Sequence, residues 1–522
     1  MSYTKKDDGY TYDDQGNIVF ANKNDDKIIK DKSIVDMFLD GVLMLATMAG
    51  LYLALVLSLN IQLDSDTVVP GLVSMAMKTD PLLRLFSLRV MDPYLADLAY
   101  YVPLQLISGY NPLVLRLSAY LIFLGILASF AYIVYKAAGW WASVAFSALF
   151  VNMSAATLAT LVLPDYHNSA ILFAGVLIIL YARYGSWKWF WAVLAAITLV
   201  SAYSDVLFLA IMAAPMFIFL SYKKEWRNAT AVLGATFVVV ALKFRWLIGS
   251  STSNAGQGID YLGLFKAAVL YVPSVLNGEA NAFITGSSSQ LGMIATLFIA
   301  LFSAMTIGYA VRRTRTILPQ NRYYMLVILP GAIFLMLAYI TGAFTEPRYL
   351  TYLAITFCML AASMSDQRLL KIIIVAVAVM GLIANAGFIT NMSDNRPNNA
   401  DTINMANYLV AHNYTYGYSD YWHSSINTYL TAQRVVVMPL CLDNNTTIQE
   451  SNNIEYQWYK GNGFILDQND TIQTPDWHTE VQGLIKEYPP EAVDVVNNNT
   501  TIYTFNQSTW NRMNVSTLII RA

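Results

Sequence analysis

Long apolar runs are the feature that most restricts what this chain can fold into. A helix that crosses a bilayer needs about 20 apolar residues, because its backbone rises about 1.5 Å per residue through a hydrocarbon core about 30 Å thick. Such runs occupy residues 37–61, 113–135, 139–160, 168–183, 188–205, 206–222, 229–248, 290–311, 323–341, 348–364 and 370–390. Charged residues make up only 13% of the chain, whereas soluble domains carry roughly a quarter. The sequence therefore predicts an α-helical polytopic membrane protein with about eleven transmembrane helices.

Basic residues indicate how these spans are oriented. Short cytoplasmic loops collect Lys and Arg, and basic residues occur here in alternate connections between the runs. They are Lys136, Arg183, Lys188, Lys223, Lys224, Arg227, Arg312, Arg313, Arg315, Arg322, Arg368 and Lys371. The polar N-terminus, with Lys27, Lys30 and Lys32, belongs to the same side. We therefore expect the N-terminus in the cytoplasm and the C-terminus across the membrane.

Composition divides the chain into domains. The expected parts are a cytoplasmic segment at 1–35, a transmembrane domain at 36–392 whose outer loop at 62–112 carries interfacial helices, and a soluble domain at 393–522. The first segment lacks the apolar core of a signal peptide, so the run from Met37 is expected to remain as an anchor. In the last part, residue spacing predicts a helix at 400–413 and strands at 435–440 and 501–505. This pattern indicates a small C-terminal α/β domain.

Charge and motif content argue against several function classes. The net charge of −2 disfavours a nucleic-acid partner, which selects for a basic excess. The sequence contains neither a Gly-rich phosphate loop ending in Lys and Ser or Thr, nor a paired Cys/His cluster. Cys358 and Cys441 lie far apart and are not expected to pair. A substrate carried on a lipid phosphate fits this chain better than a soluble nucleotide.

Two acids, Asp64 and Asp66, stand just after the first apolar run, on the side opposite to the basic loops. A carboxylate at the membrane surface can act as a general base toward a hydroxyl, and carboxylates can also hold a divalent cation. The alternative is a helix end that faces water. The apolar, helical pattern of the following residues favours function, and we take both acids as candidate catalytic residues.

Three cations follow in the same outer loop. Lys78, Arg84 and Arg89 interrupt a long apolar segment. An amphipathic segment of this kind lies in the membrane interface, with its cations near lipid phosphates. We therefore expect these three residues to bind the substrate.

A second acidic turn precedes the run at 168–183. Asp165 and His167 stand there, and a His beside an acid can contact a phosphate or orient a nucleophile. The alternative is that Asp165 is the N-cap of the next helix. Asp205 interrupts another apolar region. We expect it at the surface in a tight outer turn, although an acid at membrane depth would be functional or paired.

A third outer turn contains Glu346, Arg348 and Tyr349 around a proline. Proline fixes the turn and thereby directs its neighbours. The guanidinium fork of Arg348 matches phosphate oxygens, so these residues are candidates for substrate binding. The alternative is an ion pair between Glu346 and Arg348.

These motifs, in this order and on this side, resemble the GT-C membrane glycosyltransferases. The branch concerned includes protein mannosyltransferases, the aminoarabinose transferase of lipid A and bacterial O-antigen-modifying glucosyltransferases. The resemblance covers residues 40–390 and includes the second span "RLSAYLIFLGILASFAYIVYK" and the late turn Glu346–Tyr349. This family often has two adjacent acids in its first outer loop. Here Ser65 separates Asp64 from Asp66, which leaves open which of them is the base.

The resemblance implies an activity and its partners. It implies an inverting transferase that moves a sugar from a polyprenyl-phosphate donor to a surface glycan acceptor, such as an O-antigen, at the periplasmic face of a bacterial inner membrane. By analogy Arg348 would bind the donor phosphate. No cofactor is required by the motifs, although a divalent cation remains an option. The alternatives are a transporter or flippase of a lipid-linked glycan, or a receptor-like membrane protein.

The soluble tail is rich in aromatic residues at 416–423. Aromatic faces stack on sugar rings, so this stretch could help to bind a glycan acceptor. The alternative is that these residues build the core of a small domain. The segment "TAQRVVVMPL" resembles the periplasmic tail domain of bacterial surface-glycan glycosyltransferases.

Overall fold

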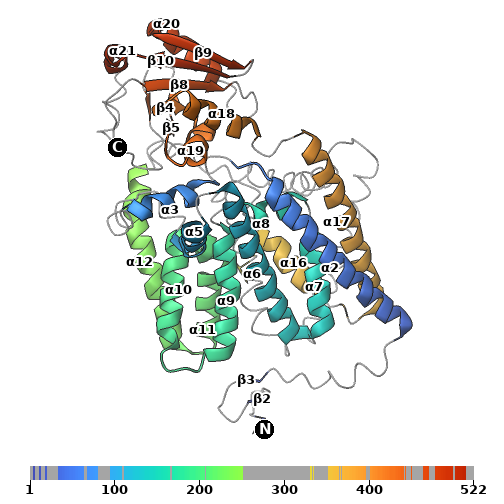
Figure 1. Ribbon diagram of the computed structural model, residues 1–522. Helices are drawn as coiled ribbons and strands as arrows, with labels where there is room; N and C mark the ends of the chain where they lie inside the picture. Colours follow the sequence, from blue (N-terminus) through green and yellow to red (C-terminus); the bar gives the residue numbers. More distant parts are fainter. Residues whose placement is uncertain are drawn as a thin grey trace, which may run out of the picture. The chain divides into compact units, whose positions relative to one another are not determined.

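The computed structural model shows a helical chain followed by a mixed α/β region (Figure 1). It describes residues 4–5, 11–12, 18–19, 33–63, 67–79, 95–108, 111–153, 155–164, 167–205, 207–250, 330–331, 333, 351–363, 365, 367–395, 400–439, 441–442, 448–449, 463–468, 477–497 and 500–512. Contacts divide the chain into two compact units: unit 1 contains Met1–Leu59 and Ala119–Met392, and unit 2 contains Asn60–Ser118 and Ser393–Ala522.

Unit 1 is built mainly from apolar helices. In chain order they are α2 (Ile34–Asn60), α6 (Pro112–Ala138, whose first turns belong to unit 2), α7 (Trp140–Val151), α8 (Ala155–Val162), α9 (His167–Tyr184), α10 (Phe190–Ser204), the π-helical turn η2 (Leu209–Ala213), α11 (Ala214–Tyr222), α12 (Trp226–Ser250), α16 (Thr351–Ala362) and α17 (Arg368–Asn395). Three two-residue strands near the N-terminus, β1 (Thr4–Lys5), β2 (Thr11–Tyr12) and β3 (Ile18–Val19), pair antiparallel.

Four of the described helices are long and apolar enough to cross a membrane: α2, α6, α9 and residues Arg368–Thr390 of α17. They coincide with the predicted runs at 37–61, 113–135, 168–183 and 370–390. Shorter apolar helices cover most of the other predicted runs. The runs at 290–311 and 323–341 lie almost wholly outside the described residues, so the number of eleven spans stays a prediction.

The predicted span at 139–160 is wrong as a single helix, because α7 ends at Val151 and α8 begins at Ala155. The break is fixed by amides inside the bundle. Nδ2 of Asn152 donates to the carbonyl of Ala46, midway along α2, at 3.0 Å, and Nδ2 of Asn385 on α17 donates to the Met153 carbonyl at 3.1 Å. Inside a membrane, a backbone that leaves helical geometry is stable only where other protein groups satisfy its hydrogen bonds.

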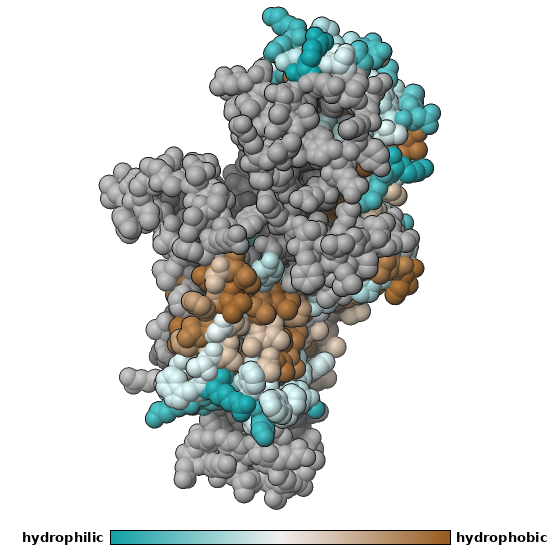
Figure 2. All heavy atoms as spheres, turned by 90° about the vertical axis from the view of Figure 1, so that its left-hand side faces the viewer, coloured by the Kyte–Doolittle hydropathy of each residue, from teal (hydrophilic) through white to brown (hydrophobic). Residues whose placement is uncertain are grey.

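Hydrophobic side chains cover the outside of unit 1. Figure 2 views the molecule from the side on which α12 stands, and it shows hydrophobic residues gathered into a patch with hydrophilic ones along its lower edge. The exposed apolar residues of α12 include Leu233, Phe237, Val238, Val240 and Leu242. Apolar surface of this extent on a helix bundle is the surface that lipid covers.

An ion pair joins helix starts at one end of unit 1. Lys371, near the start of α17, pairs with the buried Asp40 near the start of α2, and its ammonium lies 5.7 Å from the ring centre of Trp141 at the start of α7. The three helices therefore begin at the same end. This common end is consistent with the prediction that basic connections lie on one side of the membrane. Which side this is stays a prediction.

Unit 2 combines the loop between α2 and α6 with the C-terminal residues. The loop contains α3 (Val69–Thr79) and α5 (Leu95–Ser108), which pack on each other. The C-terminal elements are α18 (Ala400–Ala411), β4 (Tyr416–Ser419), α19 (Tyr421–Leu430), β5 (Val436–Pro439), β6 (Cys441–Leu442), β7 (Ile448–Gln449), β8 (Gly463–Gln468), α20 (Trp477–Glu487), β9 (Ala492–Asn497), β10 (Thr500–Phe505) and α21 (Gln507–Arg512). The assignment of residues 62–112 to the transmembrane domain stays a prediction.

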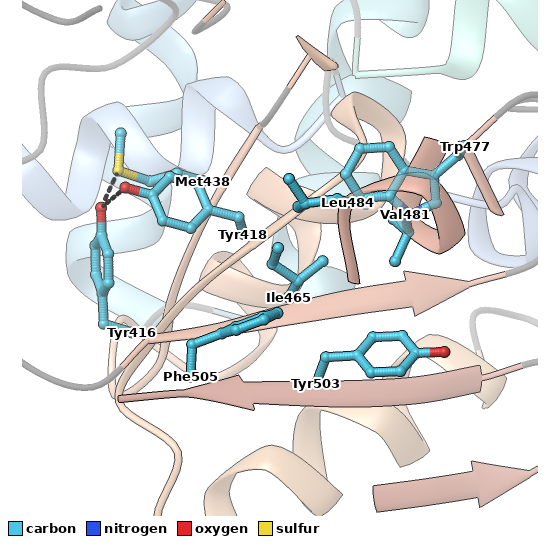
Figure 3. Close-up of a cluster of buried hydrophobic side chains, with 9 residues drawn as sticks. All are labelled: Tyr416, Tyr418, Met438, Ile465, Trp477, Val481, Leu484, Tyr503 and Phe505. Atoms are coloured by element: carbon cyan, nitrogen blue, oxygen red, sulfur yellow. Dashed lines mark hydrogen bonds between the residues drawn. The ribbon is translucent and has the colours of Figure 1, made fainter. Parts of the chain in front are cut away.

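A five-stranded sheet in the order β5-β4-β8-β10-β9 forms the centre of the C-terminal part. β4 runs parallel to both β5 and β8, whereas β10 is antiparallel to both β8 and β9. Alternate side chains fill two cores, one against α20 (Figure 3) and one against α18. The predicted helix at 400–413 and the strands at 435–440 and 501–505 are confirmed as α18, β5 and β10.

The aromatic stretch at 416–423 contributes to this core. Tyr416 and Tyr418 of β4 are buried and their hydroxyls are hydrogen-bonded at 2.9 Å, as Figure 3 shows. They pack with Trp477, Tyr503 and other apolar residues. For these two tyrosines the core interpretation holds, because buried rings cannot stack on a sugar.

Candidate functional site

The structure describes few of the side chains that the sequence pointed to. Outside the described residues lie Asp64, Asp66, Arg84, Arg89, Asp165, Glu346, Arg348 and Tyr349. Lys78 belongs to α3, and its backbone is described while its side chain is not. Whether these residues meet in one pocket stays a prediction. His167 is described fully, as are the residues that flank the two acids.

The segment that contains Asp64 and Asp66 has buried flanks. Ile61 and Leu63 precede it, with exposed fractions of 8% and 2%, and Thr67 follows with 2%. Buried side chains are held in place by close packing. The described residues on both sides of positions 64–66 are therefore held in the interior of unit 2.

Arg116 holds the chain just before this segment. One guanidinium nitrogen, Nη2, donates to the Ile61 carbonyl at 3.0 Å, and the residue is buried, with an exposed fraction of 6%. Ile61 follows directly after the end of α2, where helix carbonyls lack helical partners. A cation at that position satisfies a carbonyl and complements the helix dipole. In the sequence Arg116 stood out only as part of the second span.

Tyr429 of α19 contacts both helices of the loop, α3 and α5. Its ring packs against Gly71 of α3, where a Cβ atom would collide with the ring, and its hydroxyl donates to Oε1 of Gln105 on α5 at 3.4 Å. The glycine permits this close approach because it has no side chain. The C-terminal domain thus helps to hold the loop that carries the two acids.

In unit 1, His167 and Asp205 form a buried pair. Nδ1 of His167 and Oδ2 of Asp205 are hydrogen-bonded at 2.7 Å, and each side chain is 5% exposed. Oδ1 of Asp205 accepts the backbone N–H of Leu207 at 2.8 Å. The expectation that Asp205 lies at the surface is wrong. Its burial follows from its partner, because a buried carboxylate persists where it is paired and hydrogen-bonded.

This pair lies where α9 begins and α10 ends, so it joins two helix ends on one side of unit 1. Next to it, Nδ2 of Asn168 donates to the carbonyls of Thr160, Leu161 and Leu163 at 2.9–3.2 Å. These bonds satisfy the last carbonyls of α8, which a helix end otherwise leaves open. Asn168 therefore ties the start of α9 to the end of α8.

Sequence reasoning found His167 and missed its partner. Asp205 is 38 positions away, and no local pattern links the two residues. The signal that could have found the pair is the cost of an acid inside an apolar region, which requires a partner. Among the described residues, no group of three or more His, Cys, Asp or Glu is arranged to hold a metal ion.

Comparisons with known proteins give one structural similarity. No protein-family model matches the chain, and no curated protein matches it. Among solved structures, the chain is similar to the apo-state crystal structure of ArnT from Cupriavidus metallidurans, with 13% sequence identity and a TM-score of 0.42. The similarity covers 91% of this chain and 99% of that chain. At this TM-score the similarity by itself assigns neither a fold family nor an activity.

Proposed function

We propose that this protein is an inverting membrane glycosyltransferase of GT-C type. It moves one sugar from a polyprenyl-phosphate carrier to a surface glycan, of O-antigen or lipopolysaccharide type, at the periplasmic face of a bacterial inner membrane. The observation that supports the proposal is the burial of the described residues on both sides of Asp64 and Asp66. These residues are buried and Arg116 is bonded to Ile61, and a general base must be held within reach of the proton that it removes.

In the proposed reaction Asp64 or Asp66 takes the proton of the acceptor hydroxyl. The acceptor oxygen attacks the anomeric carbon from the face opposite to the leaving group and forms the new glycosidic bond. The bond between that carbon and the phosphate oxygen breaks, and the lipid phosphate leaves with the electron pair. Cations of the outer turns, Arg348 among them, stabilise the charge that develops on this phosphate. The anomeric configuration is inverted.

The two acids provide the decisive test. A strain that lacks the gene is complemented with the wild type, Asp64→Ala or Asp66→Ala, and its surface glycan is profiled by mass spectrometry. The wild type restores one missing sugar, whereas loss of the general base lowers the rate of transfer by about 10²–10⁴-fold. The matched control is Asp401→Ala, an exposed acid of α18, which keeps full transfer.

Full transfer by both acid variants at wild-type expression would remove the catalytic assignment. The same assay on purified protein is run with and without a chelator, because carboxylates are also the ligands that a hard divalent cation prefers. Loss of transfer on chelation, restored by added Mg²⁺, would assign the acids a metal-binding role instead.

A transporter or flippase of a lipid-linked glycan is the second candidate, and the break between α7 and α8 favours it. Interrupted helices near the midplane are typical of secondary transporters. The side chains at this break are amides bonded to backbone carbonyls, whereas transporters use ionisable groups that bind ions or substrate. A vesicle assay that detects lipid movement without modification of an acceptor would reverse the ranking.

A further inference from the structure

The C-terminal sheet has a place where its strand order reverses. From β4 the chain passes through α19 to β5 on one side, and it later returns as β8 on the other side of β4. All three strands are parallel, so their carboxyl ends meet at one edge. In open α/β sheets, ligands bind outside the carboxyl ends of strands at such a reversal. The edge between β4 and β8 is therefore the position where this topology favours binding.

Asp420 stands directly after β4 at this edge and begins α19. Its Oδ2 is hydrogen-bonded to Nδ1 of His423 at 2.7 Å, and its Oδ1 accepts the backbone N–H of the same residue at 3.2 Å. Ser419 links the two strands, because its hydroxyl donates to the Leu466 carbonyl of β8 at 3.2 Å. Both sides of the reversal are thus tied together by short polar contacts.

Asp467 occupies the matching position near the end of β8. Its Oδ2 is hydrogen-bonded to Nδ1 of His478 on α20 at 2.8 Å. The Asp467 side chain is 2% exposed and the His478 side chain 46% exposed. Oδ1 of Asp467 is buried and has no donor at hydrogen-bond geometry within the part of the chain that the structure describes, although the Gln482 amide lies near enough to stabilise the carboxylate. A buried acceptor that meets no donor is unfavourable, so this atom is suited to a donor from outside.

The residues at this edge select a class of ligand. Two carboxylates side by side repel an anion, which disfavours phosphates and acidic sugars. Hydroxyl groups, in contrast, donate to carboxylates and both donate to and accept from imidazoles. The described His, Cys, Asp and Glu residues form no group that could hold a metal ion. A neutral, hydroxyl-rich molecule fits the chemistry of this edge.

We propose that the edge between β4 and β8 is a binding subsite for a neutral glycan, in which Oδ1 of Asp467 accepts a sugar hydroxyl and His478 contacts the sugar from the open side. That this glycan is the acceptor rests on the proposed transferase function, whereas binding itself does not. The subsite belongs to the unit that also contains the outer loop.

The experiment measures binding without any donor. Full-length protein in nanodiscs is titrated with neutral oligosaccharides of glucose, mannose, galactose and N-acetylglucosamine, and binding is followed by saturation-transfer NMR. At least one oligosaccharide binds the wild type. Asp467→Asn removes the charged acceptor and weakens that binding by about tenfold or more, since a hydrogen bond to a charged group is worth about 1.5–3 kcal/mol. His478→Ala weakens it as well.

The matched control is His412→Ala, which removes an exposed histidine that is bonded to the Tyr408 carbonyl outside the cluster. Its affinity is unchanged. Asp467→Asn is expected to keep its fold, because Asn replaces a buried charge with an amide of the same shape. Thermal unfolding of each variant checks this point.

Three results would overturn the proposal: no neutral oligosaccharide binds, Asp467→Asn binds as tightly as the wild type, or a hyaluronan oligosaccharide binds as well as the neutral ones. Transfer is scored separately. If binding holds and no transfer is found, the subsite stands and the proposed transferase function fails. If transfer holds and Asp467→Asn leaves the acceptor KM unchanged, the subsite fails alone.

Discussion

Each unit of this protein contains a His–Asp pair of nearly the same geometry, and the two pairs differ in access to water. His167 and Asp205 are 2.7 Å apart with both side chains 5% exposed. His478 and Asp467 are 2.8 Å apart, with the imidazole 46% and the carboxylate 2% exposed. The first pair closes a junction between helix ends, whereas the second offers an open imidazole beside a buried carboxylate.

The difference teaches that contact distance alone does not define a role. When one member of a pair that is buried on both sides is lost, water cannot replace the lost hydrogen bond. A pair with one open side can replace a lost bond by water or by a ligand. The pair in unit 1 is therefore expected to matter for stability, and the pair in unit 2 for binding.

The largest effect should follow from Asp205→Ala. This change removes the hydrogen bond that Asp205 makes with the buried His167, which costs about 1–3 kcal/mol, and it removes the side-chain cap of the Leu207 amide, worth about 1 kcal/mol. We expect a loss of about 3 kcal/mol in the free energy of unfolding, measured by thermal or denaturant unfolding in detergent micelles.

Asp205→Asn is the control for this effect. Its amide oxygen can still cap Leu207, and its amide nitrogen can face Nδ1 of His167 once the imidazole proton moves to Nε2. Most of the stability should therefore return. If Asp205→Ala unfolds like the wild type, the pair is dispensable, and the contrast with the open pair of unit 2 disappears.

A smaller effect should follow from Gly71→Ala, which tests how the loop and the tail are joined in unit 2. The new Cβ would collide with the ring of Tyr429, and overpacking costs about 1–3 kcal/mol. We expect a loss of about 2 kcal/mol in the stability of unit 2, together with slower sugar transfer because the loop with the acids is displaced. Limited proteolysis of the tail and the glycan profile measure the two effects.

Gly483→Ala is the matched control, because it makes the same change in a different setting. Gly483 lies inside α20, and a Cβ there meets nothing within 4 Å. Alanine in a helix interior is more stable than glycine by about 0.5–1 kcal/mol, so this variant should be slightly more stable and equally active. Equal results for the two variants would show that Tyr429 does not hold the loop.

Local patterns in the sequence correctly predicted those features that depend on residues close together in the chain. The run at 168–183 predicted α9 within one residue at each end, because a long apolar segment in lipid must satisfy its backbone internally. Two strands of the tail, β5 and β10, were predicted from local residue patterns in the same way. The break at Asn152 was not predicted, because the partner of Asn152, Ala46, is 106 positions away.

The same distinction applies to the candidate site, where residues marked by a local pattern were identified and residues with remote contacts were not. Asp64, Asp66 and His167 were identified by their position after or before an apolar run. The residues that hold them were not, because their contacts are remote: Tyr429 reaches Gln105 across 324 positions. Asp467 and His478 are only 11 positions apart, but their significance arises from the parallel pairing of β4 with β8, which no spacing in the sequence reveals.

The smallest effect concerns the pH dependence of stability, and it arises in the pair of unit 2. Burial raises the pKa of Asp467 above its ordinary value of 3.8, and the hydrogen bond from His478 offsets this only in part. The folded protein therefore binds the proton of Asp467 more tightly than the unfolded chain. The stability that this group contributes is fully present below pH 3.8 and is lost as the pH rises through the folded pKa.

Asn at position 467 carries no charge at any pH, so the comparison isolates this one group. Asp467→Asn should match the wild type in stability at the acid end and exceed it toward neutral pH, by less than the effect of Gly71→Ala. Unfolding midpoints of both proteins across this range measure the gap. A gap that shrinks as the pH rises would mean that the bond to His478 outweighs burial, and that the carboxylate at the open pair is stabilised in its charged form without any ligand.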